Sequence, residues 1–171
     1  MGKKEVKTNV ARLLDKAGIE YSLIPYEVDP DNLAATHVAE SLGEDISRVF
    51  KTLVLVGEPS GPKGYAAGAR SAGYFVCVIP GDAEVDLKKA ARAAGMKSAA
   101  MLHMKELFPL TGYVRGGCSP IGMKKPFPTF FHESCLGFDY IYVSAGQRGL
   151  QLKINPDDLV GYVGATVADL I

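Results

Sequence analysis

The sequence predicts a single α/β domain in which a mixed sheet is packed against surrounding helices. Two observations support this prediction. The length of 171 residues suits one domain and is ample for a buried core. Apolar runs typical of strands are interleaved with segments of helical spacing along the whole chain. Neither an internal repeat nor a long linker divides the sequence, so residues 1–171 are expected to form one unit.

The first half of the chain predicts two helices and two strands before a glycine- and proline-rich loop. Apolar residues at helical spacing predict the helices, and Gly18 and Gly43 are expected to end them. Apolar and β-branched runs predict the strands. In chain order, these elements are a helix over 6–17, a strand over 21–26, a helix over 34–42, a strand over 49–56 and a loop over 57–64.

The second half continues the alternation. Pro80-Gly81 is expected to close a strand, and Asn155-Pro156 is expected to start the last helix because proline suits the first helical turn. The expected elements are strands over 74–79, 98–101, 138–144 and 150–154, helices over 85–94 and 104–108, and a glycine loop over 113–122.

Composition limits the classes of function. No run approaches the roughly 18 apolar residues of a membrane span, and the first residues lack the apolar segment of a secretory signal, so a cytoplasmic protein without a membrane partner is expected. The three cysteines are expected to be free thiols, since their number is odd and they form no CxxC pair.

The net charge is zero, because 19 basic side chains match 19 acidic ones. This balance argues against tight, autonomous binding of nucleic acid. A local basic pocket would resolve the difficulty, and an ordinary solvated surface is the alternative. The basic residues that could form such a pocket are Lys51, Arg70, Arg115, Lys124, Lys125 and Arg148.

Lys51 is the most informative single residue, because it interrupts a run that otherwise predicts a buried strand. Its ammonium group must either reach solvent or face a cavity that takes an anionic partner. An edge strand with Lys51 in water is the structural alternative.

Two glycine segments could complete a site. Residues 116–122 (GGCSPIG) combine flexible glycines with a fixed proline, a pattern that can aim backbone amides at an oxyanion. Residues 144–149 (SAGQRG) supply a hydroxyl and a guanidinium suited to ribose or phosphate. Any tight turn could have the same composition.

These segments, taken in order, resemble the YbaK family of Cys-tRNA(Pro) deacylases, relatives of the editing domain of bacterial prolyl-tRNA synthetases. The resemblance covers nearly the whole chain. It is carried by Tyr26 with Glu27 and Asp29-Pro30, by 49–53 (VFKTL), by 116–122 with Lys124-Lys125, and by 142–150 (YVSAGQRGL).

The resemblance implies a trans-editing hydrolase with a barrel-like closed or curved sheet, acting on aminoacyl-tRNA, with prolyl-tRNA synthetase as a candidate partner. Lys51 would hold the 3′ end of the tRNA, and Gly117 would belong to the turn that lines the aminoacyl pocket. The other residues implied to bind substrate are Tyr26, Thr52, Ser119, Pro120, Ser144, Gly146 and Arg148. Gln151 departs from the family, which has an acidic residue there, and this leaves the amino acid specificity open.

No catalytic triad, metal-ligand spacing or cofactor motif is apparent, so neither metal nor cofactor is expected. In the family that this chain resembles, the thiolate of the cysteinyl substrate attacks its own ester. Hydrolysis of Ala-tRNA(Pro) by water is the alternative reaction. A non-enzymatic module that binds a nucleotide or small ligand is the alternative class of protein.

Three sharper hypotheses are weaker than their structural alternatives. Cys118 could be a nucleophile but has no partnered base in the sequence, and His132 with Cys135 could hold zinc but lack further ligands. Tyr113, Tyr140 and Tyr142 could stack on bases, although aromatic residues on strands more often belong to the core.

Overall fold

The strands form two sheets in the computed structural model, which describes residues 8–59 and 73–171. The smaller sheet is antiparallel, in the order β1 (Tyr21–Pro25), β7 (Leu150–Ile154), β6 (Ile141–Gln147). The larger sheet has the order β4 (Met96–Met101), β2 (Phe50–Pro59), β3 (Tyr74–Pro80), β5 (Thr129–His132), β8 (Thr166–Ala168). Its last two pairings are parallel and the others are antiparallel, so the predicted mixed sheet is confirmed.

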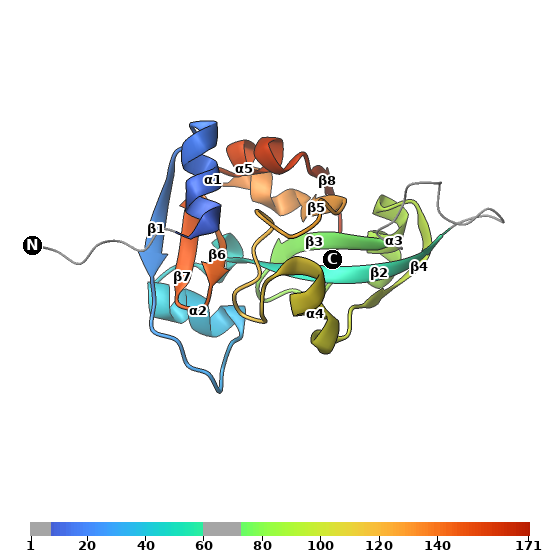
Figure 1. Cartoon of the computed structure of the whole chain (residues 1–171), viewed down its shortest axis with the longest axis horizontal. Coiled ribbons are helices and arrows are strands. Elements are labelled where there is room, and N and C mark those ends of the chain that lie inside the picture. The colour runs from blue at the N-terminus through green and yellow to red at the C-terminus, as the bar shows by residue number, and fades with distance from the viewer. Residues whose placement is uncertain (1–7, 60–72) are drawn as a thin grey trace, which may run out of the picture.

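The two sheets lie next to each other along the long axis of the molecule (Figure 1). An isolated parallel bridge between Val49 and Tyr142 connects the start of β2 to β6. The described strands do not close into a barrel. The mixed α/β class is therefore confirmed, whereas the expected barrel-like closure is not.

The helices begin and end largely where the sequence indicates. They are α1 (Asn9–Ala17), α2 (Ala35–Leu42), α3 (Leu87–Ala93), α4 (Met104–Thr111) and α5 (Pro156–Val163), with short 3₁₀ turns η1 (Ile46–Arg48) and η2 (Glu133–Gly137). Asn155 caps α5 by accepting hydrogen bonds from two backbone amides of its first turn. Gly18 ends α1 in the left-handed conformation, with φ of 72°.

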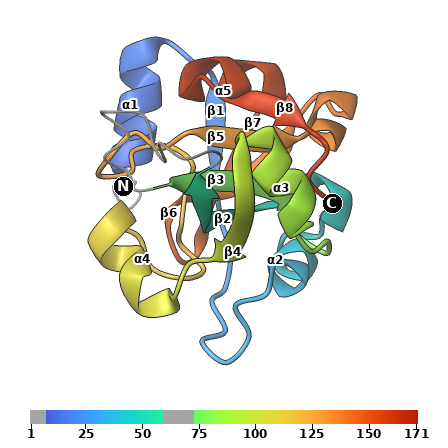
Figure 2. The same ribbon diagram turned by 90° about the vertical axis from the view of Figure 1, so that its right-hand side faces the viewer.

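Three apolar clusters hold the sheets and helices together. The largest joins α1 and α5 to both sheets and includes Val10, Leu14, Phe131, Val143 and Leu152. The second lies between the larger sheet and α3, and the third packs α2 against Val49 and Tyr142. Figure 2 shows α3 and α4 on either side of β4, so β2 and β4 separate the α3 cluster from the side that α4 covers.

Several boundaries differ from the predictions. Residues 57–59 belong to β2, not to a loop, because β2 continues across a bulge at Glu58 and Pro59 to pair with β4. β5 and β8 were not predicted, and β6 starts only at Ile141, which pairs with Ile154 at the end of β7. Val6, Arg70 and residues 60–64 lie outside the described residues.

Candidate active site

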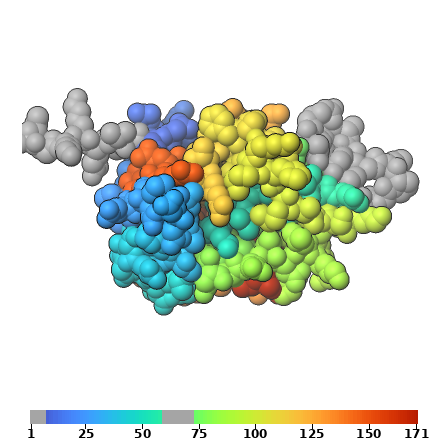
Figure 3. All heavy atoms as spheres, turned by 90° about the horizontal axis from the view of Figure 1, so that it is seen from below, coloured from blue at the N-terminus to red at the C-terminus, as the bar shows by residue number. Residues whose placement is uncertain are grey.

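A cavity of about 490 Å³ opens between α2, the first half of β2, α4 and the glycine loop. Figure 3 views the face on which the α4 residues, in yellow, lie beside the segment that precedes α2, in blue. The polar and small residues that line the cavity are Lys51, Thr52, Gly81, Arg115, Gly116, Cys118, Ser144 and Gln151. Its apolar wall comes mainly from α2, β2, the end of β4 and α4.

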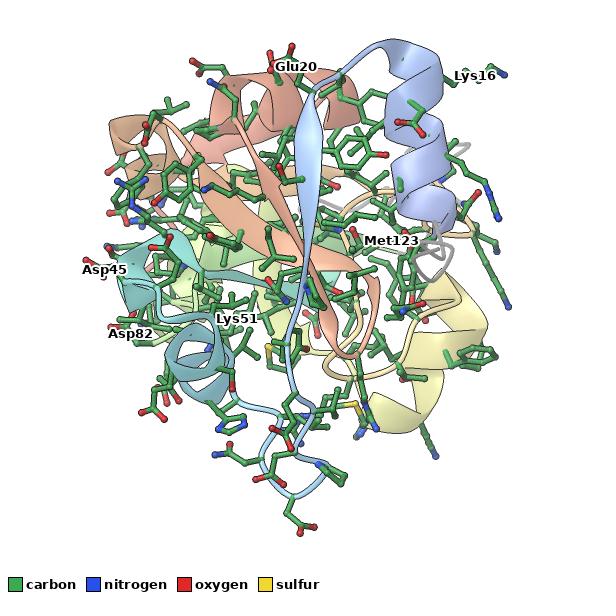
Figure 4. All side chains as sticks on the ribbon, turned by 90° about the vertical axis from the view of Figure 1, so that its left-hand side faces the viewer. Lys16, Glu20, Asp45, Lys51, Asp82 and Met123 are labelled. Carbon is green, nitrogen blue, oxygen red and sulfur yellow. The ribbon has the colours of Figure 1, made fainter. Side chains whose placement is uncertain are left out.

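Lys51 lies on β2 and lines this cavity. At Lys51, β2 is paired with β3 but not with β4, which joins β2 only from Leu55 onward. The structural alternative expected Lys51 to lie in water, whereas it is half-buried and lines the cavity. In Figure 4, Lys51 lies within the outline of the molecule near α2, while Asp45 and Asp82 lie toward its edge. Burial lowers the pKa of Lys51, and the negative charges of Glu84 and Asp82 oppose this effect only in part. The cavity thus holds a half-buried cation suited to an anionic partner.

Thr52 and Gln151 supply polar atoms that the protein leaves unpaired. Thr52 Oγ1 and Gln151 Oε1 are buried and have no hydrogen-bond partner among the described residues. Both residues line the cavity. Because unpaired buried polar groups are costly, two of them at one cavity indicate a place where a ligand provides the missing hydrogen bonds.

Ser144 lines the cavity from β6, opposite Gln151 on β7. The register of the two strands shifts directly after this pair, where β6 bulges. Gly146 adopts φ of 102° there, and its amide donates to Ser144 Oγ at 3.2 Å. A Cβ at Gly146 would lie 3.1 Å from Val10 Cγ2, so this glycine serves the packing of the bulge against α1.

The glycine loop contributes to the cavity through Arg115, Gly116 and Cys118. Gly117 packs behind them, where a Cβ would lie 3.1 Å from the backbone nitrogen of Arg148. The Gly117 amide donates to the Val114 carbonyl at 2.9 Å. Glycine at this position therefore lets the loop lie directly on the β6–β7 turn.

The remaining predicted site residues lie just outside the cavity lining. Ser119 is fully buried and its Oγ accepts from the Ile121 amide at 3.3 Å, and Pro120 is buried beside it. Arg148 Nε donates to the Arg115 carbonyl at 2.8 Å, which ties the two glycine segments together. The Tyr26 amide donates to the Gly149 carbonyl at 2.9 Å.

Among the residues that line the cavity there is no histidine, aspartate or glutamate. Burial raises the pKa of the Cys118 thiol to about 12, so the thiol is protonated at neutral pH and is a poor nucleophile. Within residues 8–59 and 73–171, no three potential metal ligands come together. The site can bind, orient and polarise a substrate, but it offers little acid–base chemistry of its own.

The histidine and the three tyrosines considered as possible ligand or base contacts make hydrogen bonds within the protein. His132 Nδ1 accepts from the Leu170 amide at 3.1 Å. Tyr140 and Tyr142 both donate to Glu44 Oε1, at 2.9 and 3.1 Å, and their rings pack edge to face. Tyr113 donates to the Ile121 carbonyl. None of these residues lines the cavity.

Sequence reasoning missed the apolar wall. Its members on β4 and α4 are Met101, Leu102, Met104 and Leu107, and those before and on α2 are Leu33, Ala34, Ala35 and Val38. No local pattern in the sequence indicated this wall. The feature that marks it is the exposure of large apolar side chains at the β4–α4 junction, which only the structure shows.

A single α/β domain whose cavity holds one half-buried cation and unpaired acceptors, with no histidine or carboxylate in its lining, defines a class of protein that positions a polar, anionic substrate. Residues 29–162 match the family model of the aminoacyl-tRNA editing domain. The chain is 43% identical to "Putative Cys-tRNA(Pro)/Cys-tRNA(Cys) deacylase EbsC" of Enterococcus faecalis, over 98% of this chain and 95% of that protein.

Two further comparisons agree with this. A crystal structure of "a putative trans-editing enzyme for prolyl tRNA synthetase" has a TM-score of 0.76 and 25% identity, covering 96% of this chain and 98% of that one. A proline–tRNA ligase of Cupriavidus necator is 32% identical over 57% of this chain and 15% of that protein. The chain belongs to the aminoacyl-tRNA editing domain family, which confirms the resemblance found in the sequence and the editing class of function.

Proposed function

We propose that this protein is a trans-editing deacylase that clears Cys-tRNA(Pro) by cleaving the ester between cysteine and the terminal ribose. The observation that carries the proposal is the cavity itself: Lys51, Thr52 and Gln151 line it, and the last two bring buried oxygens that have no partner in the described part of the chain. A relative that matches almost the whole chain bears the name of a Cys-tRNA deacylase.

In this proposal, Lys51 binds the 3′-terminal nucleotide through its phosphate or ribose. Gln151 Oε1 and Thr52 Oγ1 accept hydrogen bonds from the aminoacyl group, whose α-ammonium needs acceptors. Ser144 shapes the pocket beside Gln151, and Gly117 sets the loop that carries Gly116 and Cys118 along the wall. Arg148, Ser119, Pro120, Gly146 and Tyr26 act as positioning residues, since their contacts hold the two glycine segments in place.

The reaction uses the substrate's own thiol. The cysteinyl sulfur, as thiolate, attacks the ester carbonyl carbon, so a C–S bond forms while the C–O bond to the ribose breaks. The ribose oxygen leaves with the proton that the thiol gave up, and the amino acid departs as a cyclic thiolactone. The protein supplies orientation and stabilisation of the oxyanion, so the reaction needs no histidine or carboxylate in the cavity lining.

The amino acid specificity is left open at Gln151, and Ala-tRNA(Pro), hydrolysed by water, is the second candidate substrate. Gln151 lines the cavity at the position where the family has an acidic residue, and a neutral amide changes the electrostatics around the substrate ammonium. Either reaction leaves the protein an aminoacyl-tRNA deacylase.

We further propose that the protein works in the cytoplasm and acts alongside prolyl-tRNA synthetase. The likeness to part of a proline–tRNA ligase supports this pairing. Within the described part of the chain, no helix is long and apolar enough to cross a membrane.

A deacylation assay with Cys-, Ala- and Pro-tRNA(Pro) tests the proposal. We expect rapid loss of cysteine, slower loss of alanine and retention of proline. Retention of all three amino acids, with or without added synthetase, would contradict the enzymatic proposal and favour a binding module.

A further inference from the structure

Large apolar side chains are exposed at the mouth of the cavity. Met101, at the end of β4, is 45% exposed, and Met104 and Phe108, on α4, are 57% and 56% exposed. Met101 and Met104 also line the cavity. Phe108 follows Met104 by four residues, so both lie on the same face of the helix. The apolar surface therefore continues from the cavity out to Phe108.

Lys124 places a cation over the exposed ring of Phe108. Its Nζ lies 5.2 Å from the ring centre. The Lys124 amide donates to the Thr111 carbonyl at 3.1 Å, which fixes the end of the glycine loop against α4. The Lys124 side chain passes over Gly112, where a Cβ would lie only 3.4 Å from Lys124 Cγ. An aromatic face and an ammonium group are thus held together at one place on the surface.

Charge is distributed unevenly around this place. Residues 104–125 contain four basic side chains and one acidic side chain, whereas the rest of the chain has fifteen basic and eighteen acidic ones. The basic members are Lys105, Arg115, Lys124 and Lys125. A protein with no net charge therefore has a local basic excess in the segment from α4 to the glycine loop, and Arg115 of this segment lines the cavity.

We propose that Met101, Met104, Phe108 and Lys124, together the α4 surface, bind the single-stranded 3′ end of the tRNA. A base next to the terminal nucleotide stacks on Phe108, and its phosphate contacts Lys124. This inference rests on the proposed function and assigns its RNA-binding surface.

The spacing fits one or two nucleotides. Met104 at the cavity and Phe108 are separated by about one helical turn, roughly 5.4 Å, and a stacked strand rises roughly 3.4 Å per base. Stacking on aromatic rings combined with basic groups along the backbone is the usual means of holding single strands. Met and Phe are common in protein interfaces as well, but lysine is depleted from the cores of such interfaces, so Lys124 favours an RNA strand over a protein partner.

The test measures binding without hydrolysis. The probe is an RNA hairpin that carries no amino acid and ends in single-stranded ACCA. Its Kd is measured by fluorescence anisotropy. Phe108→Ala should weaken binding roughly 5- to 150-fold, the range of one lost base stack, whereas Phe108→Trp should retain it. Lys124→Ala should weaken binding and reduce the steepness of its salt dependence by about 0.7.

Matched controls come from the same chain. Tyr162→Ala removes an exposed aromatic residue from α5, which like α4 has eight residues. Lys16→Ala removes an exposed lysine from the last turn of α1, and Figure 4 shows Lys16 pointing outward from the molecule. Both control variants should bind the hairpin like the unchanged protein.

Kinetics separates this inference from the proposed function. With full-length aminoacyl-tRNA, Phe108→Ala should raise KM more than it lowers kcat, and the loss should be confined to substrates that carry the upstream nucleotides. If the unchanged protein cleaves no ester, the proposed function fails, but the hairpin assay still decides the RNA surface. Equal losses in the control variants, or unaltered RNA binding with weakened binding to prolyl-tRNA synthetase, would overturn the inference.

Discussion

Ser144 and Gln151 are directly opposite each other on the antiparallel strands β6 and β7, and both side chains line the cavity. They are buried, with 7% and 5% of their surface exposed. The β6 bulge begins immediately after Ser144. The smaller sheet therefore contributes one cross-strand polar pair to the site, while the larger sheet contributes Lys51 and Thr52 on β2.

Lys51→Ala is expected to lower kcat/KM for Cys-tRNA(Pro) by roughly 10- to 150-fold or more, the equivalent of a hydrogen bond to a charged group. Thermal stability should stay unchanged or rise slightly. The pKa of Lys51 is lowered in the folded protein, so its charge opposes folding below that pKa, and the opposition fades as pH rises toward the unfolded value. Kinetics and thermal melts check both parts.

The matched control for this change is Lys97→Ala, which removes an exposed lysine from the edge strand β4. Its activity should remain normal. If the folded Lys51 variant turns over substrate at the normal rate, Lys51 is not an anchor. If Lys51 is the anchor, KM should begin to rise at a lower alkaline pH than it would with a lysine of ordinary pKa. The pKa of Lys51 is lowered, and only its ammonium form binds an anion.

Two threonines with buried hydroxyl groups offer a matched pair. Thr52 Oγ1 has no partner in the described structure, whereas Thr129 Oγ1 donates to the Phe127 carbonyl at 3.0 Å. Thr52→Val should therefore leave stability unchanged or raised while lowering kcat/KM, since substrate is the missing partner. Thr129→Val should cost about 1 kcal/mol of stability with activity retained. If Thr52→Val instead lowered stability and kept activity, Thr52 would not belong to the substrate site.

The pattern of residues predicted most elements of the fold because local signals were strong. Gly18 and Gly43 stop helices through left-handed caps, and Asn155 caps α5, as their types indicate. β5 and β8 escaped prediction because they are short and pair in parallel with strands distant in sequence. Their identity depends on tertiary pairing, which local alternation does not encode.

The candidate site was predictable to a similar extent. Lys51 stood out because a charge interrupts an apolar run, and it lines one cavity with Thr52 and Ser144. The contribution of Met104 and Leu107 could not be predicted, since apolar residues on a helix look alike whether they face a core or a cavity. Gln151 was noticed only through the family resemblance, as a neutral residue where an acidic one was expected. Because Gln151 is buried at the cavity, this difference in charge lies next to the proposed substrate site.

Gln151→Glu is expected to lower KM for Cys-tRNA(Pro) by roughly 5- to 10-fold. A carboxylate forms a charge-assisted hydrogen bond to the substrate ammonium, which is stronger than the bond to a neutral amide by about 1 kcal/mol. Gln147→Glu makes the same chemical change at an exposed position of β6 and should have no such effect. Steady-state kinetics with both variants distinguishes them, and equal KM values would contradict the contact.

The protein's own three cysteines are expected to be dispensable for deacylation. Burial raises the pKa of Cys77 and Cys118 to about 12 and contributes most to raising that of Cys135 to about 11, so all three thiols are protonated near neutral pH. Changing all three to alanine should preserve most of the deacylation rate. Cys118→Ala alone can alter the shape of the cavity that it lines. A loss of several orders of magnitude with the fold intact would restore Cys118 as the nucleophile.

The substrate's thiol is expected to be the nucleophile, because no histidine or carboxylate lines the cavity to activate a water molecule. Cysteinyl ester should therefore be cleaved far faster than seryl ester of nearly equal size, and methylation of the thiol should stop the reaction. Selection by size alone predicts otherwise: cysteine, serine and alanine should then differ by only about 10- to 200-fold. Single-turnover rates with the four esters decide between these mechanisms. Rapid cleavage of alanyl ester would replace the thiol-assisted route with water attack, while the protein would remain a deacylase.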